Sequence, residues 1–558
     1  MFAVLQLLIG FVLISNAYLS PNTNENPIVT TPLGKVKGAI LTTVLGKPIY
    51  SFRGIRYGKP PVGELRFKPP VPVDRWNHVY DATKDGAICP QPTEPNDVDI
   101  ASEDCLLLNV YTTKLPRGHH NPRRPVMVFF HAGGFYSVTG SSRWGGPDYL
   151  LDQNIVLVTL NYRLASLGFL STGDRLAPGN NGLKDQVVAL RWIRDNIVAF
   201  GGDPNSVTIF GYSAGGTSVN LHMISPMSRG LFHRAIFMSA SAFGQWPVKP
   251  HQFDLAQKQA RILNCPDDTS ANIINCLRTK PAEELGNSLP EFSEFGFDPI
   301  LIWTPVIEPD FGQERFLTEN PIELAMKGRF VKIPVIGSIS ALEFAGSAFN
   351  VILNDTLRKE MDEDFERVAP IAFIYERDTE NSKHISRELR KFYLGDRPLD
   401  NSSIPGLAKL YAEGVTGFGV NRGVKLLAAK NDKPVYYFRF NFPGRYSHFY
   451  LPGTMTPYGV VHHDELIYLF YISPVFPRFN TTSPEYVMVK KLTTIFANFA
   501  RTGNPTPYPN DALDNISWIP FTNRNKEYLD IGEKLIMKTN LYEDRYSKWE
   551  ELFPLPSK

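Results

Sequence analysis

Short apolar runs alternate with helical patterns between residues 126 and 239. The runs at 126–130, 155–160 and 235–239 are almost continuous, which is typical of strands buried on both faces of a sheet. Between the second and third runs, apolar residues recur at helical spacing: Leu183, Val187, Leu190, Ile193 and Ile197. Strands that alternate with helices predict an α/β fold built on a large, mostly parallel sheet.

The remaining segments have different patterns. Residues 28–38 alternate like a small hairpin, and residues 333–337 and 434–442 have the composition of two further strands. Residues 354–430 are helical and rich in charge, whereas residues 245–329 combine helical segments with long loops. Because no internal repeat or low-complexity linker separates these segments, we expect one domain in which the helical insertions form a cap.

The first residues have the pattern of a secretory signal peptide. Residues 2–14 are almost wholly apolar, and Ser15 and Ala17 place small residues three and one positions before a cleavage site. We therefore predict residues 1–17 as the signal peptide and residues 18–558 as the mature, secreted domain. A membrane-spanning helix needs about 20 apolar residues, so we predict no membrane span.

Composition narrows the class of protein further. The 558 residues include 58 basic and 56 acidic side chains, and the net charge is +2. A nucleic-acid-binding protein normally has a strong basic excess, so nucleic acid is excluded as a partner. The 43% of hydrophobic residues is ordinary for a globular protein with a large core.

The four cysteines predict two disulfides in a secreted protein. Their order suggests the pairs Cys89–Cys105 and Cys265–Cys276, although three connectivities are possible. No two cysteines have the C-x-x-C spacing of a zinc site, so we predict no metal. Four asparagines begin glycosylation sequons and are expected on surface loops: Asn354, Asn401, Asn480 and Asn515.

The strongest chemical motif lies at Gly211-Tyr-Ser-Ala-Gly215. A β-branched and aromatic run at 207–210 precedes it, and a segment able to form a helix follows it. The motif is therefore a strand, a sharp turn and a helix with Ser213 at the apex, which is the arrangement of a nucleophile elbow. A helix N-terminus beside the serine favours developing negative charge.

A serine nucleophile needs a base, and a carboxylate that orients this base. The elbow predicts the chain order serine, acid, histidine, and only His462 and His463 lie in a suitable late loop. Glu343 follows the end of a predicted strand and lies between Ser213 and these histidines. Three other carboxylates remain nearby competitors for the role of the acid: Glu308, Glu319 and Glu323.

The segment His131-Ala-Gly-Gly-Phe135 follows a predicted strand and precedes the elbow. A glycine-rich loop at this place supplies backbone N–H groups to the oxyanion in α/β-hydrolases. We therefore predict that Gly133, Gly134 and Ala214 form the oxyanion hole.

The chain resembles the type-B carboxylesterase and cholinesterase-like family of α/β-hydrolases over nearly the whole mature sequence. Six segments carry the resemblance: 103–111, 131–136, 161–169, 200–204, 230–235 and 459–466. The family pattern implies that His462 is the base and Glu343 the acid, and it supports both disulfides in the order suggested above. It also aligns Trp246 with an aromatic residue of the acyl pocket, although a packed core tryptophan is an equal alternative.

Three residues depart from the family pattern. Tyr212 replaces a usual Glu before the nucleophile, Ala132 replaces a Gly, and Phe344 replaces the Gly that normally follows the acid. The elbow also differs from the Gly-Gln-Ser-Ala-Gly of juvenile-hormone esterases. Residues 90–104 lack the tryptophan with which cholinesterases bind choline, so the sequence looks most like secreted insect carboxylesterases, including venom-type ones.

The resemblance implies a serine carboxylesterase that hydrolyses a small carboxylic ester through an acyl-enzyme and needs no cofactor. The helical cap should then surround the active-site gorge. The alternative is a catalytically inactive adhesion or recognition protein on the same fold, but such relatives typically lack a triad member and this chain fills every position. The sequence leaves the natural ester and the oligomeric state open.

Overall fold

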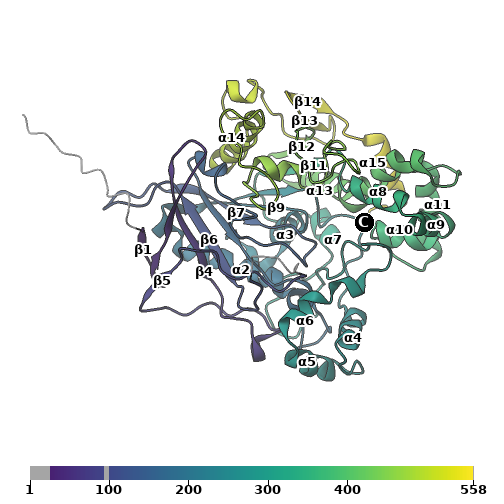
Figure 1. Ribbon diagram of the computed structural model, residues 1–558, viewed down its shortest axis with the longest axis horizontal. Helices are drawn as coiled ribbons and strands as arrows, with labels where there is room; N and C mark the ends of the chain where they lie inside the picture. The colour runs from purple at the N-terminus through teal and green to yellow at the C-terminus, as the bar shows by residue number, and fades with distance from the viewer. Residues whose placement is uncertain (1–25, 93–99, 557–558) are drawn as a thin grey trace, which may run out of the picture.

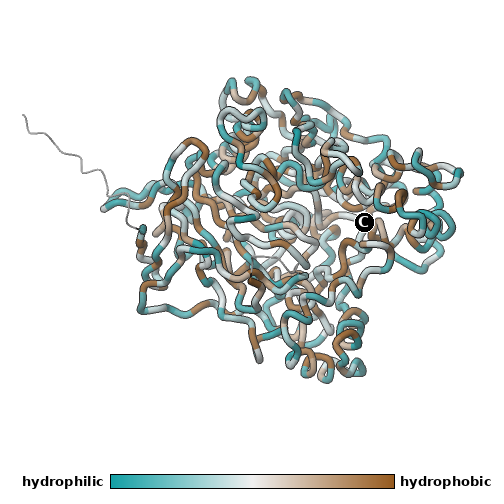
Figure 2. Tube along the Cα trace, viewed as in Figure 1, coloured by the Kyte–Doolittle hydropathy of each residue, from teal (hydrophilic) through white to brown (hydrophobic). Residues whose placement is uncertain are grey.

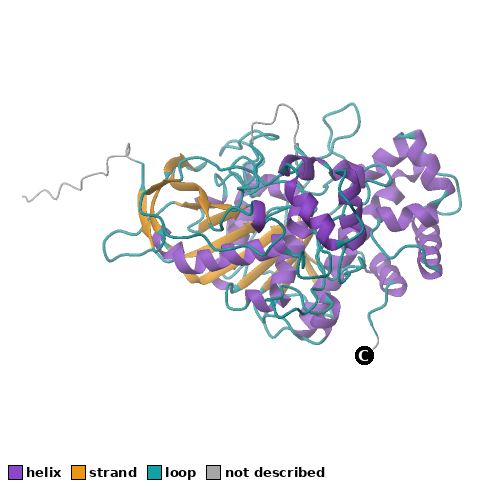
Figure 3. Cartoon of the chain, turned by 90° about the horizontal axis from the view of Figure 1, so that it is seen from below, coloured by secondary structure: helices purple, strands orange, loops and turns teal. Residues whose placement is uncertain are grey.

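A large twisted sheet passes through the centre of the molecule (Figures 1 and 3). In the computed structural model, which describes residues 26–92 and 100–556, this sheet has eleven strands. The predicted signal peptide and its cleavage site lie outside the described residues. The strands, in their order across the sheet, are β14 (Leu535–Thr539), β13 (Glu527–Ile531), β12 (Val435–Phe440), β11 (Val335–Ser340), β10 (Arg234–Met238), β9 (Gly202–Tyr212), β7 (Arg124–Phe130), β8 (Val156–Leu160), β6 (Leu107–Thr112), β4 (Pro48–Arg56) and β3 (Ala39–Thr42).

The seven strands from β13 to β8 pair in parallel, and antiparallel pairs occur only toward the two edges of this sheet. This arrangement confirms the predicted α/β-hydrolase fold with a large, mostly parallel sheet. A second sheet of three strands in the described residues contains β1 (Ile28–Thr31), β2 (Gly34–Lys37) and β5 (Val79–Asp81). In it, β1 and β2 form the hairpin that residues 28–38 predicted.

Both faces of the central sheet are buried because successive side chains of each strand point to opposite sides. On β7, Val126 and Val128 belong to one apolar cluster, whereas Met127 and Phe129 belong to the other. Figure 2 shows apolar segments along these strands and hydrophilic segments mainly at the periphery. The continuous apolar run at 126–130 therefore correctly predicted a strand covered on both faces.

Helices cover the two faces and form a separate layer at one end. Those of the first apolar cluster include α1 (Ala165–Phe169), α2 (Asn181–Asn196), α3 (Ala214–Ile224), α4 (Phe253–Ile262), α5 (Ser270–Thr279), α6 (Ala282–Asn287), α7 (Pro321–Met326) and α13 (Phe418–Lys430), and α14 (Tyr486–Thr502) covers the opposite face. The end layer, at the right of Figure 1, contains α8 (Ala345–Leu353), α9 (Asp355–Glu363), α10 (Phe365–Ala372), α11 (Glu380–Tyr393), α12 (Ile404–Ala412) and α15 (Glu543–Leu552). Four of its helices, α9 to α12, belong to the helical segment predicted at 354–430, whereas α13 of that segment covers the sheet.

The two strands nearest the C-terminus, β13 and β14, were not predicted from the sequence. Strands β13 and β14 are five residues each, and β14 exposes alternate side chains at the edge of the sheet. Such short segments have too few apolar positions to distinguish them from loops. The strand predicted at residues 333–337 is also shifted, because β11 begins at Val335, after a proline that cannot donate a hydrogen bond to a neighbouring strand.

The two disulfides and the four glycosylation sequons lie where the sequence predicted them. Cys89 is bonded to Cys105 and Cys265 to Cys276, which confirms the sequential pairing. The asparagines of all four sequons are exposed: Asn354, Asn401, Asn480 and Asn515. Across the described residues, none of the helices has the length and apolar character needed to span a membrane.

Candidate active site

Ser213 lies at the turn between β9 and α3, where the sequence predicted the nucleophile elbow. Its backbone has φ 54° and ψ −123°, a conformation that a residue with a side chain rarely adopts. Such backbone strain costs about 1–3 kcal/mol and persists only where the surroundings impose it. Here the Ser213 N–H donates a hydrogen bond to the Met238 carbonyl oxygen (2.9 Å) at the end of β10.

The second glycine of the motif is required by a close approach of backbone. A Cβ atom on Gly215 would lie 2.0 Å from the carbonyl oxygen of Phe130, the last residue of β7. Only glycine therefore allows α3 to start directly above the end of the neighbouring strand. This packing holds Ser213 beside the N-terminus of α3, on the side of the sheet where the parallel strands end.

His462 and Glu343 meet although 119 positions separate them in the sequence. The His462 Nδ1 atom lies 2.5 Å from the Glu343 Oε2 atom, while Glu343 Oε1 accepts a hydrogen bond from the Ser340 N–H (2.7 Å). The Glu343 side chain is only 1% exposed, and that of His462 is 8% exposed. The carboxylate thus fixes the orientation of the imidazole, which is the geometry expected of an acid that orients a base.

The three competing carboxylates lie elsewhere. Glu308 is buried in an ion pair with Lys184. Glu319 and Glu323 both pair with Lys327 in the helix-bearing segment around α7. Among the four candidates named from the sequence, Glu343 is therefore the one that contacts His462.

The adjacent His463 has a different environment. Its backbone N–H donates a hydrogen bond to the Tyr212 Oη atom (2.8 Å). Burial, with smaller effects from the nearby His462 and His448, lowers the pKa of His463 well below its usual value. The His463 imidazole is therefore neutral near pH 7, and Tyr212, the replacement for the usual Glu, holds the loop that carries His462 through the His463 backbone.

The predicted oxyanion loop follows β7 and has the required backbone. Gly133 and Gly134 have φ 104° and 58°, and a Cβ on Gly133 would lie 2.0 Å from the Ser137 carbonyl oxygen. Within the described part of the chain, the N–H groups of Gly133, Gly134 and Ala214 donate to no other protein group. All three residues line the same cavity as Ser213, so their N–H groups remain free for an acceptor there.

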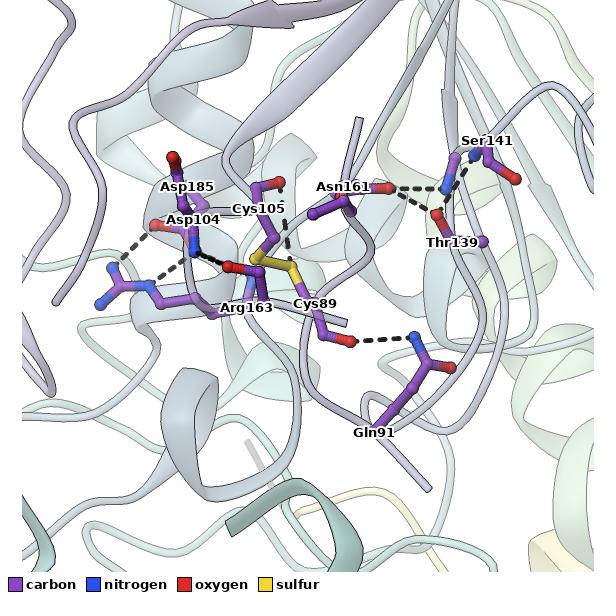
Figure 4. Close-up of a disulfide and its surroundings, with 12 residues drawn as sticks. Cys89, Gln91, Asp104, Cys105, Thr139, Ser141, Asn161, Arg163 and Asp185 are labelled. Carbon is purple, nitrogen blue, oxygen red and sulfur yellow. Dashed lines mark hydrogen bonds and ion pairs between the residues drawn. A yellow bond between two sulfur atoms is a disulfide. The ribbon is translucent and has the colours of Figure 1, made fainter. Parts of the chain in front are cut away.

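The Cys89–Cys105 disulfide lies near Thr139 and Ser141, in the segment that follows this loop (Figure 4). Gln91 donates a hydrogen bond to the carbonyl oxygen of Cys89 and accepts one from the Val138 N–H (2.7 Å). Asn161 in turn accepts a hydrogen bond from Thr139 (2.8 Å). The bridge therefore restrains the segment that immediately follows the two oxyanion glycines.

One cavity of about 190 Å³ brings the predicted residues together. Ser213, His462 and the oxyanion loop line one part of it. The wall also includes residues that the sequence did not single out, among them Tyr136, Thr217, Ile300, Leu301, Val415, Thr416 and Gly419. No sequence periodicity identifies these positions, because they come from separate loops, from α3 and α13, and from the π-helix Glu413–Gly417.

Trp246 also lines this cavity, but it is only 9% exposed and packs within the first apolar cluster. Its Nε1 atom donates a hydrogen bond to the Ser241 carbonyl oxygen (3.3 Å). The two interpretations of Trp246, as cavity wall and as core residue, are thus both compatible with its position.

A buried polar layer lies beneath the histidine loop. Glu465 accepts hydrogen bonds from the hydroxyls of Ser338 (3.0 Å) and Ser340 (2.8 Å). Burial, and secondarily the negative charge of Glu343, raises the pKa of Glu465 to about 8. Glu465 therefore binds the hydroxyls at the end of β11, whereas Glu343 is the carboxylate that contacts His462.

The candidate residues do not form a metal site. Across the described residues, no group of three or more His, Cys, Asp or Glu side chains is arranged to hold a metal ion. His131 is neutral as well, because burial lowers its pKa to about 4. The functional groups present are thus a serine, an imidazole–carboxylate pair and free backbone N–H groups.

The sheet topology and the strand–turn–helix at Ser213 define the fold as that of an α/β-hydrolase. The sequence model of the "Carboxylesterase family" matches residues 25–549 of this chain. The chain belongs to this family, and it is a carboxylic-ester hydrolase; the inactive adhesion-type alternative is not retained.

Individual relatives agree with this assignment. The chain is 36% identical to "Juvenile hormone esterase" of Tribolium castaneum, over 92% of this chain and 89% of the relative. It is 37% identical to "Esterase FE4" of Myzus persicae, over 92% of this chain and 90% of the relative. It is also similar to the crystal structure of juvenile hormone esterase from Manduca sexta with OTFP covalently attached. That comparison gives a TM-score of 0.82 at 27% identity and covers 95% of this chain and 100% of the other.

The raised pKa of Glu465 predicts how stability depends on pH. The folded protein retains a proton on Glu465 up to about pH 8, whereas a free Glu loses it near 4.5. The free energy of unfolding should therefore fall as pH rises through this interval. We expect Glu465→Gln to show a smaller fall between pH 5 and pH 8, measured by chemical denaturation with the disulfides intact.

Glu64→Gln is the matched control for this experiment, because the Glu64 side chain is 85% exposed. It should reproduce the wild-type pH dependence. A Glu465→Gln variant with an unchanged pH dependence would instead mean that Glu465 is already ionised in the folded protein.

Proposed function

We propose that the protein is a secreted serine carboxylesterase in which Ser213, His462 and Glu343 form the catalytic triad. The observation that carries this proposal is the 2.5 Å contact between Glu343 and His462 Nδ1. It leaves His462 Nε2 buried and without a hydrogen-bond partner among the described residues. Because His462 and Ser213 line one cavity, this nitrogen is suited to accept the proton of the serine hydroxyl.

In the proposed reaction, the Ser213 Oγ atom attacks the ester carbonyl carbon while His462 Nε2 takes its proton. The carbonyl oxygen becomes an oxyanion and accepts hydrogen bonds from the N–H groups of Gly133, Gly134 and Ala214. The C–O bond to the alcohol then breaks, and the imidazolium gives its proton to the leaving oxygen. Water next attacks the carbonyl carbon of the acyl-enzyme and gives a proton to His462. His462 then returns this proton to the Ser213 Oγ atom as the carboxylic acid leaves.

Several observations support secretion as part of this proposal. The N-terminal residues have a signal-peptide pattern, and two disulfides form in the described chain, as expected in an oxidising compartment. The exposed sequon asparagines are accessible to glycosylation. We further propose that residues 18–558 act as one catalytic domain, because elements from 133 to 463 line one cavity together with Ser213.

The first test of this proposal concerns the nucleophile. Ser213→Ala removes one hydroxyl and should fold and be secreted normally, but its turnover of an aryl ester should fall by several orders of magnitude. A labelled organophosphonate should attach to Ser213 in the wild-type protein, as identified by peptide mass spectrometry. Retained activity in the variant, or labelling of another residue, would refute the mechanism.

The second test concerns the acid. Glu343→Gln preserves the shape of the side chain but removes the charge that orients and stabilises the His462 imidazolium. We expect kcat to fall by roughly 10³–10⁴, by analogy with the Asp→Asn change in a serine-protease triad, and KM to change little. Steady-state hydrolysis of one aryl ester measures both constants.

Glu319→Gln and Glu323→Gln are controls for this test, since both carboxylates lie in exposed ion pairs with Lys327. Both should remain within a few-fold of the wild-type kcat. A nearly active Glu343→Gln variant would assign the acid to another carboxylate.

The third test asks whether Trp246 belongs to the acyl pocket. Trp246→Leu removes a ring from the cavity wall, so kcat/KM should increase for bulky acyl groups relative to acetyl esters. The measurement is a profile of kcat/KM over p-nitrophenyl esters of increasing acyl length. An unchanged profile in a stably folded variant would favour a purely structural role in the core.

A further inference from the structure

Phe344 occupies an unusual backbone conformation directly after the proposed acid. Its φ of 52° and ψ of 22° are in the left-handed region, which disfavours residues with a side chain. The family pattern places a glycine here, which would adopt this conformation without strain. A bulky residue that persists in such a conformation at the edge of the cavity suggests that its side chain contributes to function.

The side chain of Phe344 lies on the imidazole of His462. The two ring centroids are 4.0 Å apart, and the ring planes are inclined by only 29°, so the rings are stacked. Phe344 is half-buried and lines the same cavity as Ser213. It therefore contacts both the proposed base and the space in which the ester would react.

Two further rings border the imidazole of His462. The Tyr212 ring is 4.9 Å away and inclined by 59°, and the His463 ring is 4.3 Å away and inclined by 43°. Tyr212 is fully buried and, through its hydroxyl, holds the His463 backbone. Phe344 is the one ring of the three that stacks, and it is attached to the residue after Glu343, so the acid and the stacked ring are positioned together.

We propose that Phe344 is a positioning residue that holds the imidazole of His462 by ring stacking and stabilises its protonated form. The inference rests on the proposed catalytic function of Ser213, His462 and Glu343. A cation on the face of an aromatic ring is attracted by the negative charge of the π-system. Because the imidazolium forms only during the reaction, this attraction favours the transition state over the ground state and so increases kcat.

The titratable groups around His462 include Glu343, His448, His463, Asp464 and Glu465. Glu343 supplies the negative charge at Nδ1. On the neighbouring segments, burial lowers the pKa of His463 and His448, so both are neutral near pH 7. Burial likewise raises the pKa of Asp464 to about 7 and that of Glu465 to about 8.

The test compares two substitutions that keep an apolar or aromatic group at this position. Phe344→Leu fills the space without a π-system, whereas Phe344→Tyr keeps the ring. We expect kcat of Phe344→Leu to fall about three- to tenfold at nearly constant KM, and that of Phe344→Tyr to stay within about twofold of wild type. Since loss of the ring makes protonation of His462 harder, the acidic limb of the kcat/KM profile should shift to lower pH by about half a unit in Phe344→Leu but not in Phe344→Tyr.

Two further variants control for folding. Phe349→Leu removes a ring from α8, the helix that Phe344 directly precedes, but Phe349 packs on Phe449 and Tyr458 instead of His462, so kcat and the pH profile should not change. Phe344→Gly restores the residue suited to φ 52° and should therefore fold even if the leucine variant does not. It should also lose kcat, because it lacks the ring.

The outcomes separate the two proposals. If Phe344→Leu and Phe344→Gly both match wild type in kcat, or if Phe344→Tyr loses as much as they do, the positioning role is wrong. A change in KM with an unchanged kcat and pH profile would also refute it, because Phe344 would then contact only the substrate. If the wild-type protein itself does not react with the labelled organophosphonate at Ser213, the proposed function fails instead.

Discussion

The site depends on the tight turn at Ser213, where backbone from three parallel strands meets within contact distance. Gly215 touches the carbonyl oxygen at the end of β7, and the N–H of Ser213 is bound by the end of β10. These contacts impose the strained conformation of the serine and offset its cost. They also determine where the remaining chemistry can be placed, since everything that acts with Ser213 must come from loops at the same edge of the sheet.

The parallel sheet meets this requirement through its topology. The oxyanion loop follows β7, Glu343 follows β11, and the His462 loop follows β12, so that each segment starts at the carboxyl end of a parallel strand. A carboxylate and an imidazole 119 residues apart can then come within 2.5 Å of each other. The disulfide at Cys89 and its neighbour Gln91 add a covalent restraint to the loop that would bind the oxyanion.

The three departures from the family pattern have separate physical accounts. Ala132 lies within the apolar core and does not have the positive φ that Gly133 and Gly134 require, so its methyl group is tolerated. Tyr212 supplies a hydroxyl that fixes the histidine loop. Phe344 accepts backbone strain and places its ring on His462. Two of the three substitutions therefore act on the same imidazole.

The parallel strands and the nucleophile could be predicted from local sequence signals. Apolar runs buried on both faces identified the parallel strands, and the glycine spacing of the elbow identified Ser213, because both reflect constraints on neighbouring residues. The pairing of Cys89 with Cys105 was only one of three possible connectivities until the structure placed the two sulfurs together. The choice of Glu343 over other carboxylates, and the wall of the cavity, depend on contacts between segments far apart in the chain. Such contacts leave no period in the sequence, so only the tertiary structure could decide them.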